Sequence, residues 1–102
     1  MSEFDEEGEL ATVTRKKFKR PSRYKVILHN DDYTTMEFVI YVLKVIFGKS
    51  DEESHEIMLT VHNQGHGVCG IYTHEVAETK MERVSLDAKE NGHPLLCSIE
   101  AE

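Results

Sequence analysis

Residues 28–36, Leu-His-Asn-Asp-Asp-Tyr-Thr-Thr-Met, lead from an apolar strand through a polar turn into a helix. Asn and Asp are common in turns because their side chains bond nearby backbone groups and tolerate left-handed conformations. Two acids beside an Asn at a strand exit also suit a cationic or hydrogen-bond-donating ligand. The stretch therefore leaves two interpretations open, a solvated turn and a ligand site.

The sequence on either side of this turn has two different periodicities. Residues 23–28 alternate with a period of two, which predicts a strand. Thr34 and Glu37 have the spacing of a capping box, so we expect a helix over residues 35–47 that stops at Gly48. Its apolar side chains fall on one wide face, made of Met36, Val39, Ile40, Leu43, Ile46 and Phe47.

The rest of the chain predicts two more helices and two more strands. Ser50 and Glu53 repeat the capping-box spacing, and Thr73 is placed to cap the last helix. The predicted order is β-α-α-β-α-β, an α+β fold in which three helices pack on one face of a three-stranded antiparallel sheet. The further elements are a helix from residue 51 to Gly65, a strand over 68–72, a helix from Thr73 to about Glu90, and a strand over 95–99.

Length and charge divide the chain into a tail and one domain. Its 102 residues with 39% apolar content suffice for a single core. Residues 1–21 hold few large apolar groups, so we expect a mobile tail followed by one domain over residues 22–102. From residue 26 onward, fourteen acids face five bases. A domain of that charge repels phosphate, which argues against nucleic acid and favours a peptide partner, although the basic residues 15–25 could touch RNA.

The two cysteines and the hydropathy bear on the compartment. Cys69 and Cys97 both lie in apolar runs, which is typical of buried free thiols in a reducing compartment. No apolar run approaches the ~20 residues that span a bilayer, and the acidic start lacks the features of a signal peptide. We therefore expect a cytoplasmic protein that does not enter membranes.

A metal site is one interpretation of the histidines. His62 and His66 are four residues apart, but Gly65 lies between them and is expected to end the helix. The sequence has no two cysteines at the close spacing of a zinc site. It also lacks the sequence motifs of a serine hydrolase and of a zinc protease. A metal-dependent protein built on His62, His66 and Asp31 stays an alternative, but we expect no cofactor.

A substrate pit at the strand exit is another interpretation. Taken singly, His62 reads as a solvated helix histidine, and the apolar residues read as core. However, the strand exit must pass the start of the first helix, and the second helix packs beside it. This arrangement would place an acid and an imidazole at the mouth of a pit lined by methionine.

The same residues resemble the ClpS family, the bacterial adaptors that recognise N-degrons and deliver them to the ClpAP protease. The resemblance runs in register from about Tyr24 to Leu96. One departure is Thr35, where the family usually has proline. The matching blocks are Asn30-Asp31-Asp32-Tyr33-Thr34, Met36-Glu37-Phe38-Val39, Met58-Leu59 with Val61-His62 and Gln64-Gly65, Glu75-Val76-Ala77-Glu78-Thr79-Lys80, and His93-Pro94-Leu95-Leu96-Cys97.

The resemblance implies a binding protein rather than an enzyme. It implies that Asn30, Asp31 and His62 hold the α-ammonium of a substrate that begins with Leu, Phe, Tyr or Trp. It also implies that the protein is a monomer, that Glu75 and Lys80 dock on the N-terminal domain of the unfoldase ClpA, and that ClpA engages residues 1–21. An interaction domain of similar fold that ignores amino termini stays an alternative. The implied pocket is lined by Thr34, Met36, Val39, Met58, Val61 and Leu95.

Overall fold

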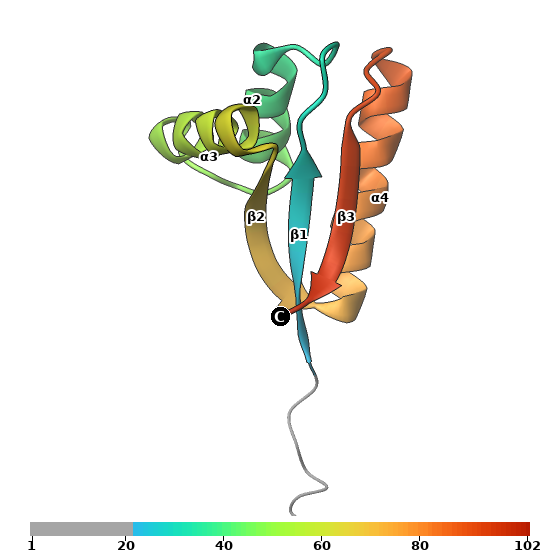
Figure 1. Cartoon of the computed structure of the whole chain (residues 1–102). Helices are drawn as coiled ribbons and strands as arrows, with labels where there is room; N and C mark the ends of the chain where they lie inside the picture. The colour runs from blue at the N-terminus through green and yellow to red at the C-terminus, as the bar shows by residue number, and fades with distance from the viewer. Residues whose placement is uncertain (1–21) are drawn as a thin grey trace, which may run out of the picture.

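The computed structural model describes residues 22–102, so the predicted tail lies outside the described residues. Figure 1 shows an antiparallel sheet whose strand order is β2-β1-β3. The predicted α+β fold and its order of elements are confirmed. The elements are β1 (Arg23–His29), α2 (Met36–Val45), α3 (Asp51–Gln64), β2 (His66–Thr73), α4 (His74–Glu90) and β3 (Leu96–Ala101).

The sheet has one covered face and one open face. Val26 and Leu28 of the central strand are fully buried in the core, together with side chains of all three helices. Side chains alternate along a strand, so Ile27 and His29 point to the opposite face. Strand β2 has a bulge at Cys69, because Val26 pairs with Gly70 while the next residue of β1, Ile27, pairs with Val68. Cys69 is the extra residue of β2, so it has no partner of its own on β1.

The start of α2 differs from the prediction by one residue. The hydroxyl of Thr34 donates to Asp31 Oδ2 at 2.7 Å, so it is not the helix cap. Thr35 takes that position instead, and its Oγ1 accepts from the Phe38 N–H at 3.1 Å. The predicted capping box of Thr34 and Glu37 is therefore wrong, and the residue that replaces the family's proline supplies the cap.

The far end of α2 also comes earlier than predicted. The helix ends at Val45, although Ile46 and Phe47 remain buried. Lys80 Nζ donates to the Ile46 carbonyl at 2.8 Å and lies over the Phe47 ring at 5.8 Å. This contact with α4 satisfies one of the carbonyls that a helix end leaves without an intrahelical partner.

Helix α3 begins and ends as predicted. Ser50 and Glu53 form a complete capping box, and Gly65 caps the other end with φ of 91°. The Gly65 carbonyl then accepts from the Asn30 N–H at 2.9 Å, which ties α3 to the exit of β1. Gly67 allows close packing, because a Cβ there would lie 2.8 Å from a methyl of Val61.

Both cysteines are buried free thiols, as predicted. Burial raises the pKa of Cys97 to about 12 and raises the pKa of Cys69 further. A thiol that stays protonated is a poor nucleophile, so these side chains serve as core residues.

One buried hydroxyl leads to a stability prediction. Ser54 of α3 is fully buried, and its Oγ finds no hydrogen-bond partner within residues 22–102. We expect Ser54→Ala to raise the free energy of unfolding by about 1 kcal/mol in urea denaturation, because an unsatisfied hydroxyl is removed and alanine favours helix. Ser85→Ala, at an exposed position of α4, is the matched control and should gain about 0.5 kcal/mol or less. A loss of stability in Ser54→Ala would show that the hydroxyl has a partner in solution.

Candidate functional site

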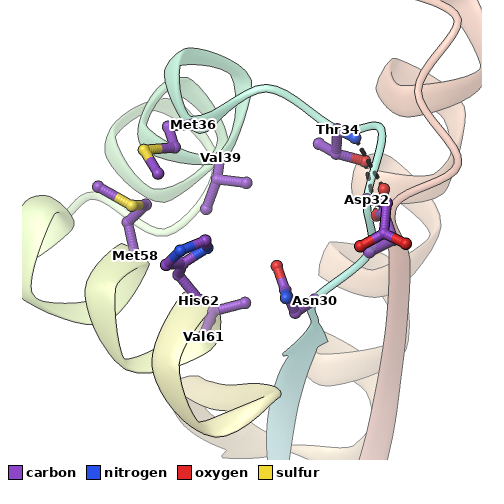
Figure 2. Close-up of a pocket in the computed structure, with 9 residues that line it drawn as sticks. Asn30, Asp32, Thr34, Met36, Val39, Met58, Val61 and His62 are labelled. Carbon is purple, nitrogen blue, oxygen red and sulfur yellow. Dashed lines mark hydrogen bonds between the residues drawn. The ribbon is translucent and has the colours of Figure 1, made fainter.

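A cavity of about 230 Å³ opens where the exit of β1, the start of α2 and the last turns of α3 meet. An apolar cavity of about 150 Å³ holds a benzene molecule, so this one has room for a large side chain but not for a nucleotide cofactor. Figure 2 shows its lining residues, which are Asn30, Asp31, Asp32, Thr34, Met36, Val39, Met58, Val61 and His62.

The cavity has a polar side and an apolar side. In Figure 2, Asp32 and Thr34 lie on one side, Met36 and Met58 lie on the other, and Asn30 and His62 face one another across the space. Asn30 is exposed at the strand exit, and His62 is exposed in the last turn of α3. The site therefore offers an amide, an imidazole and carboxylates beside an apolar pit, a set rich in hydrogen-bond acceptors.

Asp31 holds the turn together by hydrogen bonds and also carries a negative charge. Its Oδ1 accepts from the backbone N–H groups of Tyr33 at 2.8 Å and Thr34 at 2.7 Å, and its Oδ2 accepts the Thr34 hydroxyl. Partial burial acts to raise the pKa of Asp31, but these bonds, with the charge of protonated His93, outweigh it and lower the pKa below its ordinary value. The carboxylate is ionised at neutral pH, and about one of its four acceptor positions is left for a ligand.

The apolar wall combines a buried floor with one exposed methionine. Val39, Met58 and Val61 are at most 7% exposed, whereas Met36 is 48% exposed. Methionine is unbranched and adapts to irregular space, so Met36 forms an adjustable rim over a fixed floor.

Two residues differ from the predicted site. Leu95 is 6% exposed and belongs to the core, while the cavity lining in residues 22–102 does not include it. Asp32 lines the cavity but was not among the predicted site residues. Its signal in the sequence was its place beside Asn30 and Asp31 in the same polar turn.

The histidines of the metal interpretation are separated. Because α3 ends at Gln64, His66 lies in β2 and does not join His62 in the cavity lining. Within residues 22–102, no group of three or more His, Cys, Asp or Glu side chains is placed to hold a metal ion.

The two residues expected to dock an unfoldase lie away from the cavity. Helix α4 begins at the end of the sheet opposite the cavity (Figure 1). Glu75 is exposed in its first turn, whereas the Lys80 ammonium donates to Ile46 and lies 5.3 Å from the centre of the Tyr72 ring. Lys80 thus already has an internal contact, which leaves part of its ammonium for a partner.

Comparison with known proteins places this chain in a family. A family model described as ATP-dependent Clp protease adaptor protein ClpS matches residues 19–98. The chain belongs to the ClpS family. It is 56% identical over 95 residues to the ATP-dependent Clp protease adapter protein ClpS of Desulfatibacillum aliphaticivorans, covering 93% of this chain and 91% of that one. It is 52% identical over 101 residues to ClpS of Hyphomonas neptunium, covering 96% and 86% of the two chains.

A solved structure agrees with both the fold and the family. The structure of Agrobacterium tumefaciens ClpS2 bound to L-phenylalaninamide superposes with a TM-score of 0.79 at 42% identity, covering 81% of this chain and all of that one. The chain is thus an adaptor of the Clp protease. Within residues 22–102, no helix is long and apolar enough to cross a membrane.

Proposed function

We propose that this adaptor binds the free α-amino group and the large hydrophobic first side chain of N-degron substrates, and delivers them to ClpA for degradation by ClpP. The carrying observation is a single cavity that joins acceptor groups to an apolar pit. The ligand of the related structure supports it, since L-phenylalaninamide has a free amino group and a benzyl side chain. The proposed first residues are Leu, Phe, Tyr and Trp.

The polar side suits an ammonium group. A peptide α-amino group has a pKa of about 7.7–8.0, so it is mostly a cation at neutral pH, with three protons to donate. Asn30 and a neutral His62 each offer one acceptor, and the charge of Asp31 lies beside them. Asp32 adds a second acid at the rim. An acetylated amino terminus has no charge and keeps only one N–H, so it is excluded.

The apolar side suits a long side chain. Burying one large side chain contributes roughly 1.5–3 kcal/mol, and each hydrogen bond to a charged group contributes about as much. At the upper values, one buried side chain and the three hydrogen bonds of an ammonium group together contribute about 12 kcal/mol. An association cost of at least about 4 kcal/mol leaves a binding free energy of about −8 kcal/mol, which corresponds to a micromolar dissociation constant. Such affinity permits both capture and release, as an adaptor requires.

Delivery uses a different surface in this proposal. Glu75 and Lys80 contact the N-terminal domain of ClpA, and ClpA engages residues 1–21 during transfer. Helix α4, which carries Glu75 in its first turn, begins at the end of the sheet opposite the exit of β1 (Figure 1), so one monomer can hold a substrate and the unfoldase together. The buried free thiols of Cys69 and Cys97 suit a reducing compartment, so we place this activity in the cytoplasm.

The decisive experiment is fluorescence anisotropy with a labelled peptide that begins with Phe, compared with the same peptide after N-acetylation. We expect roughly micromolar binding of the free peptide and its loss on acetylation. A third peptide that begins with Ser tests the side-chain requirement. Equal binding of free and acetylated peptides would contradict recognition of the amino group.

The rim residue sets a prediction on specificity. Met36→Ala is expected to admit peptides that begin with Ile or Val, because it removes the only strongly exposed apolar side chain among those lining the cavity from residues 22–102. We expect a gain of about 5- to 10-fold in their affinity, near 1 kcal/mol, with little change for Phe. Met81→Ala, on α4, is the control. If the variant still rejects both peptides, the selective group lies elsewhere.

Glu75 and Lys80 differ in what their loss should do. Lys80→Ala is expected to lower the free energy of unfolding by about 1–2 kcal/mol, because it removes the bond to the Ile46 carbonyl and the contacts with two rings. Glu75→Ala should leave stability within about 0.5 kcal/mol of the wild type. Urea denaturation separates the two. Equal stability of both variants would show that the Lys80 contact contributes nothing, and binding to the ClpA N-terminal domain is then measured on variants of matched stability.

A further inference from the structure

Two histidines face one another on the open side of the sheet. His29, the last residue of β1, is the direct cross-strand partner of His66, the first residue of β2. Directly opposite residues of an antiparallel pair point to the same face, which here is the face away from the helices. Their ring centres are 6.5 Å apart, and the planes are tilted by 33°.

One of the two rings is already oriented by a neighbour. His29 Nε2 lies 2.7 Å from the hydroxyl oxygen of Ser98 on β3. A metal-ligating histidine commonly uses its second nitrogen in this way, because the bond fixes the tautomer and the direction of the ring. The Nδ1 of His29 is then left for a ligand.

We propose that His29 and His66 form a two-histidine site for a divalent transition metal ion such as Ni²⁺, Cu²⁺ or Zn²⁺. Imidazole nitrogen suits these ions, and it binds Zn²⁺ at about 2.0–2.1 Å. At that bond length, two rings on one tetrahedral ion have centres roughly 5 Å apart. His66 is exposed, so its side chain has room to rotate toward His29.

Other histidines of the described chain are placed differently. His74 packs edge-to-face with Tyr24, with ring centres 4.7 Å apart, and the tilted ring of His93 packs on Phe38 at 4.4 Å. His55 Nδ1 lies 2.8 Å from the Asp51 carbonyl oxygen, and His62 lines the substrate cavity. Since residues 22–102 place no third His, Cys, Asp or Glu with the pair, water fills the other positions of the ion. The site is therefore open and exchangeable.

The two histidines are next in the chain to residues of the proposed substrate site, but they do not line its cavity. His29 precedes Asn30, and His66 follows Gly65, whose carbonyl accepts the Asn30 N–H. The cavity does not include His29 or His66 among its lining residues in 22–102. Loss of the metal site and loss of peptide binding are thus separable outcomes.

The test is isothermal titration of Zn²⁺ and Ni²⁺ into the full chain at pH 7.5. We expect one strongest site per chain. Its dissociation constant should be at least tenfold larger in His29→Gln and in His66→Gln. His74→Gln and His62→Gln are the matched controls and should keep the site. Ser98→Ala should weaken it less than loss of either histidine. Circular dichroism checks that each variant is folded.

Three results would overturn the proposal. One is a wild-type chain that shows no binding. Another is unchanged binding in both His29→Gln and His66→Gln. The third is loss of the site in His62→Gln alone, which would move the ion to the cavity. Peptide anisotropy on the same variants stays the independent measure of the proposed function.

Discussion

Asp31→Asn is expected to weaken binding of a Phe-initiated peptide by about 10- to 100-fold. A hydrogen bond to a charged group contributes about 1.5–3 kcal/mol, and each 1.4 kcal/mol is a factor of ten in affinity. In the proposed complex, the substitution removes a negative charge that lies beside the substrate ammonium. It keeps the shape of the side chain.

The hydrogen bonds of the turn survive this substitution, so it removes the charge and the free acceptor position of Asp31 without removing the turn. The Asn oxygen still accepts from the Tyr33 and Thr34 N–H groups, and the Thr34 hydroxyl can turn to accept from the new amide. Asp31→Ala would instead lose the turn and the charge together. A larger defect in Asp31→Ala than in Asp31→Asn would measure the contribution of the turn.

The acid dependence of stability gives a second readout for the same variant. The folded pKa of Asp31 lies below its ordinary value, so its contribution is complete above that ordinary value and is lost as pH falls through the lowered pKa. Asp31→Asn should therefore flatten the stability curve below about pH 4.

Two substitutions control the Asp31 experiment. Asp51→Asn, at an exposed position in the first turn of α3, makes the same chemical change away from the cavity and should leave affinity unchanged. Asp32→Asn, at the rim, tests whether the second acid shares the charge. Wild-type affinity in Asp31→Asn would remove this carboxylate from recognition.

Local patterns predict most of the fold, and the resemblance to the ClpS family implies most of the residues that line the cavity. Ser50, Glu53 and Gly65 act within one helix, so their spacing predicts both ends of α3. The cap of α2 was misplaced because Thr34 and Thr35 are both suitable residues. The choice depends on Asp31, which takes the Thr34 hydroxyl for the turn.

Long-range contacts explain what the sequence patterns did not reveal. Lys80 reaches Ile46, 34 positions earlier in the chain, so no local pattern shows that α2 ends there. Long-range contacts also explain why the cavity lining includes Asp32 and does not include Leu95. Packing against the core decides that Leu95 lies away from the cavity lining, and the path of the turn decides that Asp32 joins it.

The strongest dependence on conditions is expected from His62. A neutral imidazole accepts a proton from the ammonium, whereas a protonated one donates from both nitrogens and repels the cation. We therefore expect affinity for the Phe-initiated peptide to fall by about tenfold or more between pH 7.5 and pH 5, the range in which histidines change charge.

Two other groups of the protein have to be separated from His62 in this profile, whereas the peptide amino group only gains protons as pH falls and so acts in the opposite direction. Asp31 does not produce the fall, because its lowered pKa keeps it ionised across the range. His93 acts on the charge of Asp31 and stacks on Phe38, so His93→Gln is measured in parallel. Glutamine also replaces His62 as an acceptor that does not titrate, so His62→Gln should bind more weakly than the wild type but with a flat profile.

Anisotropy at matched ionic strength, with stability checked at each pH, distinguishes these cases. A flat wild-type profile would mean that His62 is not an acceptor for the ammonium. A fall that persists in His62→Gln and disappears in His93→Gln would assign the titration to the far side of Asp31. In the expected result only His62→Gln is flat. The imidazole that α3 presents at the cavity then sets the pH range over which the adaptor can hold its substrate.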